Sequence, residues 1–309
     1  MARRTLVIAN PRSAGGATGR RWKRVADRLR AALGNVEVEH TRAPRDAERL
    51  AREGVRAGVD RVVVAGGDGT LSEVVTGLLA AGLAGYAEVG VLPLGTAADF
   101  ARSLGIPRVL DRAIAALVAG AARPVDAARV TYRSAQGDER VSYCVNAASF
   151  GASAVACRVA NSRPGPFGGA SVYLFGALRA ILAHRSAPVT IRVDGALVHD
   201  APLTFAAAAN GCHFGAGMRV APDAQLDDGL LDVVIVSDLS IPGRLLGFPG
   251  IYRGAHLERA STALHRGALV EASAAPGAVP LELDGEPLGA LPARFELLPG
   301  ALSVIGPPS

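Results

Sequence analysis

The chain has 309 residues, enough for two domains with sizeable cores, and half of its residues are hydrophobic. Its net charge of +5 favours anionic partners such as nucleotides or acidic lipids. Its one lysine, Lys23, lies outside any Gly-x-x-x-x-Gly-Lys-Ser/Thr frame, which excludes a Walker-type ATPase and leaves the Val-Ala-Ile-Lys signature of protein kinases without a candidate.

The first residues carry no targeting signal. Residues 1–4 lead directly into a strand-like segment with no long apolar region behind it, so we expect no signal peptide and a cytoplasmic protein. The three cysteines are widely spaced, which fits a reducing compartment better than a disulfide framework or a zinc site. The longest charge-free runs, 141–157 and 201–218, contain polar residues and do not predict a membrane span.

Strand and helix patterns alternate from residue 5 to about residue 122. Such alternation predicts a parallel sheet covered by helices on both faces, with ligands at the carboxyl ends of the strands. The predicted strands are 5–10, 36–41, 61–66 and 89–95, and the predicted helices are 19–33, 44–57, 71–82, 97–104 and 111–119.

The loop after the third predicted strand has the sequence GGDGT, residues 66–70. Its glycines release the backbone from Cβ clashes, so that backbone N–H groups can approach another molecule closely. Asp68 adds a carboxylate between two glycines, a combination that suits a nucleotide with Mg²⁺. The alternative is a tight strand-to-helix turn that binds nothing.

Two further turns are expected at the same edge of the sheet. After the first strand, NPRSAGG places Ser13, Gly15 and Gly16 ahead of a helix, where free amides and the helix dipole can hold phosphate. An ordinary connecting loop is the alternative there. The segment LPLGTAADFAR adds Thr96 as a hydroxyl donor and Asp99, which we expect to cap a helix.

The pattern changes after Pro124 to short alternating segments typical of antiparallel strands, interrupted by helices near 170–184 and 241–247. We therefore predict an α/β domain with a parallel sheet over residues 1–124 and a mainly antiparallel β-sandwich domain over 125–309. We expect a cleft between the two domains, and the last residues are candidates for packing back on the first domain.

Two acidic turns stand out in the second half. The segment APDAQLDDGLLDV holds four aspartates, and it is either a hairpin with Asp-Asp-Gly at its tip or a cation site in which Asp228 and neighbouring carbonyls supply oxygen ligands. In LELDGEPL, Asp284 and Glu286 flank a glycine, and either could accept a proton from a hydroxyl. Taken alone, this second turn would be only a hairpin.

Taken in order, the segments NPRSAGG, GGDGTLSEVVTGLL, PLGTAADFAR, NGCHFGAGMRVAPDAQLDDGLLDV and LDGEP resemble the bacterial diacylglycerol kinase and YegS-like lipid kinase family, relatives of sphingosine and ceramide kinases. The resemblance covers nearly the whole chain. GGDGT is shared with NAD kinases and phosphofructokinases, so its pairing with Asp-Asp-Gly-Leu-Leu-Asp and Asp-Gly-Glu is the specific part. The resemblance implies a two-domain lipid kinase fold, in which an α/β domain binds ATP, a β-sandwich completes the cleft, and a lipid hydroxyl takes the γ-phosphoryl group.

The resemblance also implies roles for individual residues. Asp68 would bind the nucleotide and reach the catalytic magnesium. Asp228, with the carbonyls of Gln225 and Leu230, would hold a structural magnesium, and either Asp284 or Glu286 would be the catalytic base. The residues implied in nucleotide binding are Asn10, Pro11, Arg12, Ser13, Ala14, Thr41, Gly66, Gly67, Asp68, Gly69, Thr70, Leu71, Ser72 and Thr96.

The sequence departs from the family pattern at two places. Ala98 stands where the family usually has asparagine, which removes an amide that helps to shape the nucleotide site. The segment FGASAV lacks the acidic residue by which sphingosine kinases take an amino-alcohol head group, which disfavours a cationic sphingoid substrate. We therefore predict a kinase that uses ATP and Mg²⁺ to phosphorylate a diacylglycerol-like lipid. The alternatives are a nucleotide-binding regulatory protein without catalysis and an NAD kinase.

The predicted helix over 19–33 contains RRWKRVADRLR, residues 20–30. Trp22 and the basic residues around it predict peripheral attachment to a membrane surface with acidic head groups, and the alternative is an ordinary solvated helix face. Beyond the lipid substrate and this surface, we expect no nucleic-acid partner, and a homodimer is left open.

Overall fold

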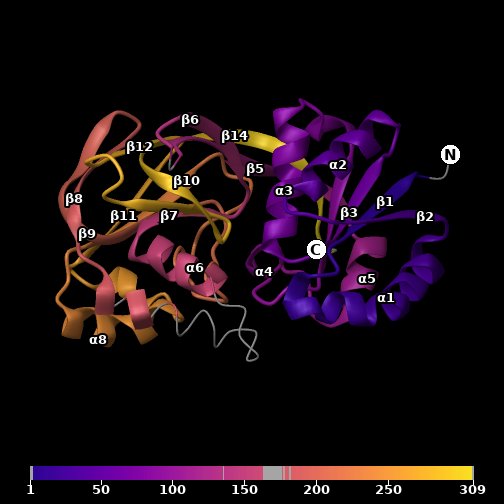
Figure 1. Ribbon diagram of the computed structural model, residues 1–309, viewed down its shortest axis with the longest axis horizontal. Coiled ribbons are helices and arrows are strands. Elements are labelled where there is room, and N and C mark those ends of the chain that lie inside the picture. The colour runs from indigo at the N-terminus through magenta and orange to yellow at the C-terminus, as the bar shows by residue number, and fades with distance from the viewer. Residues whose placement is uncertain (1–2, 135, 163–175, 177, 181, 308–309) are drawn as a thin grey trace. The chain divides into compact units, whose positions relative to one another are not determined.

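The computed structural model describes residues 3–134, 136–162, 176, 178–180 and 182–307. The chain forms two compact units, one made of Met1–Asp126 and Pro299–Ser309 and the other of Ala127–Leu298. Strands β5 (Ala122–Arg133) and β14 (Glu286–Ile305) each have residues in both units (Figure 1). The first unit therefore contains both ends of the chain.

The first unit is built on a parallel sheet, as predicted. Its strands are β1 (Thr5–Ala9), β2 (Val36–His40), β3 (Arg61–Gly66) and β4 (Glu88–Pro93), in the order β4-β3-β1-β2, and every pairing is parallel. The end of β14 joins this sheet, because Ser303 and Val304 pair in parallel with Glu88 and Val89 of β4. The last residues of the chain thus complete the first unit.

Helices cover this sheet in two pairs, α1 (Ala17–Leu33) with α5 (Leu110–Ala119) and α2 (Asp46–Arg56) with α3 (Asp68–Ala80), which lie on opposite sides (Figure 1). Helix α1 buries Val25, Ala26 and Leu29, whose spacing places them on one helical face. Short helical turns lie at Ser13–Gly16, Ala84–Tyr86 and α4 (Asp99–Ser103). Helix α3 begins at Asp68 rather than at the predicted residue 71, so most of the GGDGT segment is the first turn of a helix.

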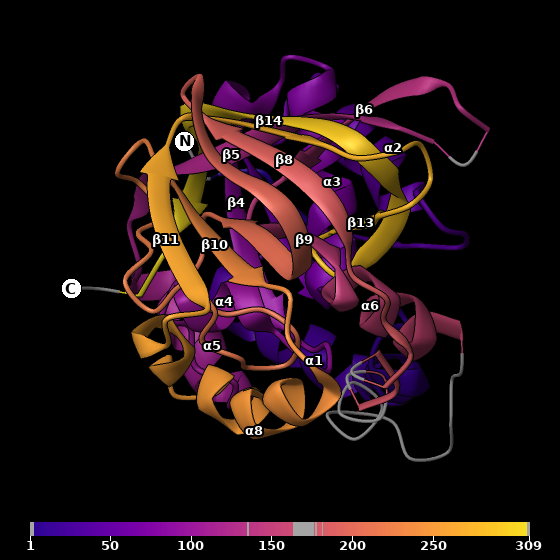
Figure 2. The same ribbon diagram turned by 90° about the vertical axis from the view of Figure 1, so that its left-hand side faces the viewer.

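The second unit is an antiparallel β structure around one large hydrophobic core. Phe150 and Phe295 stack in this core with ring centroids 6.2 Å apart, and both are almost fully buried. Figure 2 shows its strands with α8 beneath them. Besides β5 and β14 the strands are β6 (Glu139–Cys144), β7 (Ala147–Gly151), β8 (Ala187–Val193), β9 (Ala196–Ala209), β10 (Leu231–Ser237), β11 (Thr262–Gly267), β12 (Leu269–Ser273) and β13 (Pro280–Leu283).

The helices of the second unit differ from those predicted. Helix α6 (Ala152–Ser162) was not expected, because its small residues give a weak helical pattern directly after a strand. Helix α8 (Ile241–Ile251) is longer than the predicted 241–247, and a helical turn follows at Ala255–Glu258. Of the predicted helix near 170–184, residues 176, 178–180 and 182–183 are helical, and most of the rest lies outside the described residues. The described part of the chain has no helix that is long and apolar enough to span a bilayer.

Candidate functional site

The loops that follow β1, β3 and β4 meet at the carboxyl edge of the parallel sheet. Asn10 Nδ2 donates to Thr70 Oγ1 over 3.0 Å, which links the loop after β1 to the first turn of α3. Thr18 Oγ1, at the start of α1, donates to the carbonyl of Leu94 over 3.2 Å. The N–H of Thr41, which follows β2, donates to Ala9 O over 2.9 Å. The predicted nucleotide-binding segments are therefore neighbours in space.

Two glycines let the loops after β3 and β4 touch each other. A Cβ added to Gly95 would lie 2.3 Å from the Cα of Gly67, which no side chain can tolerate. The N–H groups of Leu94 and Gly95 both donate to the carbonyl of Gly66, over 2.9 and 2.8 Å. The close packing of the two loops therefore explains the glycines at positions 67 and 95 without any ligand.

The loop after β1 turns sharply through left-handed backbone conformations. Ala14, Gly15 and Gly16 have φ values of 52°, 62° and 82° in succession. Arg12 donates its N–H to Asn10 Oδ1 over 2.9 Å, and Ser13 Oγ donates to Asn10 O over 3.0 Å. The turn precedes α1 directly and already accepts part of the helix N-terminus, because the N–H of Ala17 donates to the carbonyls of Ser13 and Ala14 and that of Gly19 donates to Pro11 O over 3.1 Å.

The remaining predicted residues of this site lie in the first two turns of α3. Gly69 and Ser72 are half-buried, whereas Leu71 is 2 % exposed and packs in the core. Leu71 can therefore contribute to a ligand site only through its backbone.

In the loop after β1, Pro11 packs against Gly19, where an added Cβ would lie 3.0 Å from the Pro11 carbonyl oxygen.

Asp68 joins α3 to α4. Its Oδ1 accepts the N–H of Phe100 over 3.2 Å, at the start of α4. Burial raises the pKa of the Asp68 carboxyl, and the N–H groups of Phe100 and Asp99 oppose that rise. Asp99 does not cap α4 as expected: the N-cap residue is Ala98, no side chain of the helix caps its own N-terminus, and the carboxylate of Asp68 accepts bonds there instead.

Arg108 holds the loop after β4, and no sequence motif pointed to it. Its guanidinium donates to three successive carbonyls, those of Thr96 over 2.8 Å, Gly95 over 3.2 Å and Ala97 over 3.3 Å. This places a positive charge beside the predicted nucleotide loops.

The second group of predicted residues lies at the β13–β14 turn of the second unit. Asp284 and Gly285 have φ values of 49° and 84°, as a two-residue hairpin turn requires. The predicted Asp-Gly turn is therefore present.

Asp284 is engaged by the backbone between β6 and β7. Its Oδ1 accepts the N–H groups of Asn146 and Ala147, each over 3.0 Å, and its Oδ2 accepts that of Val145 over 3.0 Å. The thiol of Cys144 donates to Oδ1 over 3.1 Å. Burial raises the pKa of the Asp284 carboxyl, and these donors lower it. A carboxylate surrounded by four donors acts as an anchor for this turn.

Glu282 is a third carboxyl group at this turn, which the sequence interpretation missed. It is 2 % exposed and accepts the N–H of Gly285 over 2.8 Å and a short hydrogen bond from Ser149 Oγ. Burial raises the pKa of Glu282 to about 7, and the charges of Asp284 and Glu286 add to the rise. Period-2 alternation along β13 could have shown that Glu282 lies on the opposite face from its two buried leucine neighbours.

Glu286 differs from both, because it is the exposed member of the three. It begins β14, directly after the turn that Asp284 anchors. The structure therefore separates the two candidate bases: Asp284 is buried and engaged, and Glu286 is open to solvent.

The turn at Asp228 leads into β10 and is not the tip of a hairpin, because no strand precedes it between residues 210 and 230. Asp228 Oδ2 pairs with the guanidinium of Arg266 over 2.8 Å, and Asp228 Oδ1 accepts the N–H of Leu230 over 3.1 Å. Asp232 pairs with the same arginine over 3.2 Å. Arg266 of β11 thus pairs with two carboxylates at the turn that leads into β10.

The residues predicted to bind magnesium, Asp68 and Asp228, have protein partners in the structure. Among the described residues, no group of three acidic, histidine or cysteine side chains is close enough to hold a metal ion. Asp68 caps α4 and Asp228 faces Arg266. The sites proposed for Asp68 and for Gln225, Asp228 and Leu230 remain predictions.

Known proteins resemble the chain along most of its length. Residues 4–130 match the model of the diacylglycerol kinase catalytic domain, and residues 146–306 match that of the YegS C-terminal NAD kinase beta sandwich-like domain. A probable lipid kinase YegS-like of Chromohalobacter salexigens is 34% identical over 91% of this chain and 86% of its own length. Another, of Enterobacter sp., is 30% identical over 98% of this chain and 96% of its own. A putative diacylglycerol kinase structure from Bacillus anthracis, 23% identical, shares the fold with a TM-score of 0.78 over 99% of this chain and 97% of its own.

Proposed function

Because the chain belongs to the YegS-like lipid kinase family, we propose that it transfers the γ-phosphoryl group of ATP to a hydroxyl of a diacylglycerol-like lipid with the help of Mg²⁺. The observation that carries the proposal is the β13–β14 turn, where Asp284 is fixed by four donors while Glu286 is exposed. A fixed turn with one exposed carboxylate suits a general base.

The first unit supplies features suited to the nucleotide phosphates. The turn Ser13–Gly16 stands directly before α1, and Gly67 directly before α3, so two helix N-termini lie at one sheet edge. Backbone N–H groups at such termini bind phosphate, and the Arg108 guanidinium adds a positive charge next to the loop of Thr96. Such a site uses amides where Walker-type enzymes use a lysine, in keeping with the single Lys23.

The chemistry assigned to the second unit is removal of the hydroxyl proton. As the lipid oxygen bonds to the γ-phosphorus and the bond to the leaving ADP breaks, the proton passes to the Glu286 carboxylate. Asp284 acts as a positioning residue, since its carboxylate holds the turn that directly precedes Glu286. Bound magnesium would neutralise charge on the phosphates, with Asp68 as the ligand for the catalytic ion and Asp228, with the carbonyls of Gln225 and Leu230, for a structural one.

The test is phosphoryl transfer from labelled ATP to a total lipid extract, with the product identified by mass. We expect one phosphorylated glycerolipid from the parent, and a loss of about 10² or more in rate for Glu286→Gln, the scale of general-base contributions. ATP affinity should stay unchanged, because Glu286 lies outside the nucleotide loops. Near-parental transfer by this variant would overturn the assignment of the base.

The same assay separates the alternatives. Phosphorylation of NAD in place of lipid would identify an NAD kinase. ATP binding without transfer to any acceptor, in the parent and in Ala98→Asn, would identify a regulatory protein. Ala98 is the position to restore because it is the N-cap of α4, beside the Asp68 carboxylate.

A further inference from the structure

Helix α8 of the second unit is apolar on all sides. Its sequence, IPGRLLGFPGI, contains one charged residue, Arg244, and that residue is 9 % exposed. Surface helices of globular proteins carry polar and charged residues on the face turned away from the core. Helix α8 lacks such a face.

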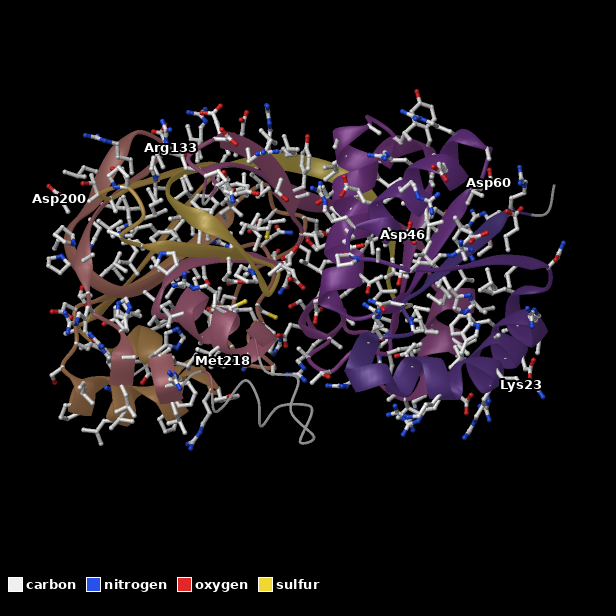
Figure 3. All side chains as sticks on the ribbon, in the orientation of Figure 1. Lys23, Asp46, Asp60, Arg133, Asp200 and Met218 are labelled. Carbon is white, nitrogen blue, oxygen red and sulfur yellow. The ribbon has the colours of Figure 1, made fainter. Side chains whose placement is uncertain are left out.

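One face of α8 lines an apolar cavity within the second unit. Arg244, Gly247, Phe248 and Ile251 follow the three- and four-residue spacing of a single helical face, and all line the cavity. Residues of α6, β9 and β10 and Met218, which is labelled in Figure 3, form other parts of the wall. This face of α8 is therefore turned toward the interior of the second unit.

Other residues of α8 carry large apolar side chains that are exposed. Leu246 is 74 % exposed, and Ile241 and Leu245, one turn apart, are 43 % and 42 % exposed. Leu178 and Leu182, also one turn apart on the neighbouring helical segment, are exposed as well. We call Leu178, Leu182, Ile241, Leu245 and Leu246 together the α8 face.

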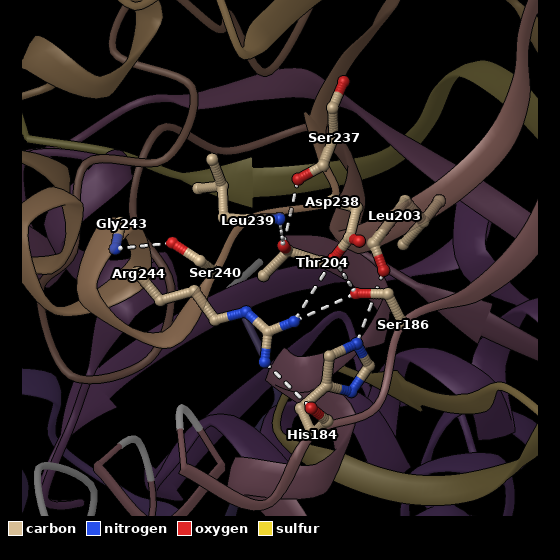
Figure 4. A network of polar contacts seen from close by, with 10 residues as sticks. All are labelled: His184, Ser186, Leu203, Thr204, Ser237, Asp238, Leu239, Ser240, Gly243 and Arg244. Atoms are coloured by element: carbon tan, nitrogen blue, oxygen red, sulfur yellow. Dashed lines mark hydrogen bonds and ion pairs between the residues drawn. The ribbon is translucent and has the colours of Figure 1, made fainter.

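A polar network fastens the two parts of the α8 face to each other. Arg244 donates to His184 O over 2.8 Å and to Ser186 Oγ over 3.0 Å, and it pairs with Asp238 (Figure 4). These contacts tie α8 to the segment that follows Leu182. The two segments that carry the exposed apolar side chains are thus fixed to each other.

The surroundings of the α8 face are basic. Arg253 follows α8 directly, and Arg259 donates to Leu246 O over 3.1 Å. Arg179 and Arg185 flank the other part of the face. The segments 178–186 and 238–260 contain only two acidic residues, Asp238 and Glu258, and Asp238 is paired with Arg244.

We propose that the α8 face inserts into the surface of an anionic bilayer, an inference that rests on the proposed lipid kinase function. Exposed leucines bordered by arginines suit the boundary between acyl chains and acidic head groups. A second copy of the chain fits less well, because a two-fold pairing of this face would bring like-charged arginines together.

The cavity beneath α8 supports a bilayer as the occupant. Ser153 lines the cavity, and its Oγ lies 2.8 Å from Ser149 Oγ, which hydrogen-bonds to Glu282 at the β13–β14 turn. The apolar cavity therefore has a polar end that connects to Glu282, at the turn that carries the proposed base Glu286. A lipid chain that enters from the bilayer would have its head group at that end.

The test is co-sedimentation with vesicles of equal parts phosphatidylglycerol and phosphatidylcholine, compared with phosphatidylcholine alone. Leu245→Gln with Leu246→Gln keeps good helix formers and removes two apolar side chains. The control is Leu197→Gln, a leucine of the same unit that is 52 % exposed on β9. We expect the double variant to bind anionic vesicles at least tenfold more weakly, and the control to bind like the parent, with all three melting at the same temperature.

Two readouts keep this inference separate from the proposed function. Phosphorylation of a short-chain diacylglycerol dispersed as monomers should be equal in the parent and the double variant, because that substrate needs no bilayer. Absence of this activity in the parent would contradict the proposed function. The vesicle experiment would still show whether the α8 face binds the bilayer. Equal vesicle binding by parent and double variant, no vesicle binding by the parent, or a parent dimer that the double variant splits in sedimentation velocity would each overturn the inference.

Discussion

At the scale of single residues, the three carboxyl groups at the β13–β14 turn have three different environments. Asp284 is saturated by donors, Glu282 is buried with a pKa near 7, and Glu286 is exposed. The resemblance to the family left Asp284 and Glu286 open as the base. Their environments favour Glu286 for the base and Asp284 for holding the turn.

Replacing Asp284 with Asn should lower the free energy of unfolding by about 2 kcal/mol or more, because charge-assisted hydrogen bonds from buried N–H groups would be lost. Urea denaturation measures this. The matched control is Asp194→Asn: Asp194 occupies another Asp-Gly turn, has a φ of 48°, and accepts the N–H groups of Ala268 and Leu269, but it is exposed. The control should lower the free energy of unfolding clearly less than Asp284→Asn does. Small and equal decreases in the two variants would contradict the role of Asp284 in holding the turn.

The raised pKa of Glu282 predicts a pH dependence of stability. A carboxyl group whose folded pKa is about 7, against 4.5 as its ordinary value, holds its proton in the folded state where the unfolded chain has lost it. Its contribution to stability is therefore full below about pH 4.5 and falls as the pH rises to about 7. Glu282→Gln removes this dependence and should exceed the parent in stability at pH 8 by about 3 kcal/mol. Denaturation series of both proteins between pH 4 and 8 would show the difference, and parallel curves would contradict it.

At the scale of elements, α1 and α8 are both candidates for membrane contact, by different physical means. In α1 the apolar residues Val25, Ala26 and Leu29 are buried, and Trp22 packs edge-on against His40 with ring centroids 5.2 Å apart. What α1 offers to solvent is charge, as Lys23 shows in Figure 3. The α8 face offers leucines instead.

This contrast sharpens the prediction of peripheral attachment through residues 20–30. Arg20→Gln with Arg24→Gln should weaken binding to anionic vesicles at low salt, and the difference from the parent should shrink as salt screens the charges. Vesicle co-sedimentation in a salt series measures this. If the variant matches the parent at every salt concentration, the basic side of α1 is an ordinary solvated face.

The turn before β10 has a structural pairing that competes with its predicted cation. Because Arg266 already neutralises Asp228, Asp228→Ala should lower the melting temperature even without magnesium. If the turn also binds magnesium through Gln225 and Leu230 carbonyls, magnesium should raise the melting temperature of the parent and not of the variant, with ATP binding retained in both. If magnesium changes the melting temperatures of the two proteins equally, the turn does not bind magnesium and only the Asp228–Arg266 ion pair stabilises it.

At the scale of the whole molecule, the first unit depends on the end of the chain. Leu302, Val304 and Ile305 are at most 2 % exposed, and the strand they form pairs with β4. Gly300 donates its N–H to Asp126 over 2.6 Å, and Gly306 donates to Ala121 O over 3.2 Å. Leu302, Val304 and Ile305 are therefore part of the first unit's core.

A fragment of residues 1–126 should for this reason fail to fold alone. It would lack three buried side chains, each contributing about 1.5–3 kcal/mol, and would expose the edge of β4. The same fragment joined through a flexible linker to residues 299–309 should fold, with a cooperative thermal transition in circular dichroism. A cooperative transition of equal midpoint in both fragments would contradict the prediction.

Features that depend on neighbouring residues could be predicted from the sequence. Alternating strands and helices predicted the parallel sheet, and Asp284-Gly285 predicted a hairpin turn, because periodicity and turn chemistry are local. The order of the glycine-rich and acidic segments indicated the lipid kinase family, which the similarity of the whole chain confirms.

Features that depend on residues far apart in the chain could be seen only in the folded structure. The donors that saturate Asp284 lie between residues 144 and 147, the partner of Asp228 is Arg266, and the strand that completes the first sheet comes from residues 299–305. The helical pattern of residues 241–247 likewise could not show which residues of α8 line a cavity and which are exposed. In each case burial and hydrogen bonding come from segments that only folding brings together, so a local pattern cannot tell a buried carboxylate from an exposed one, or a buried leucine from an exposed one.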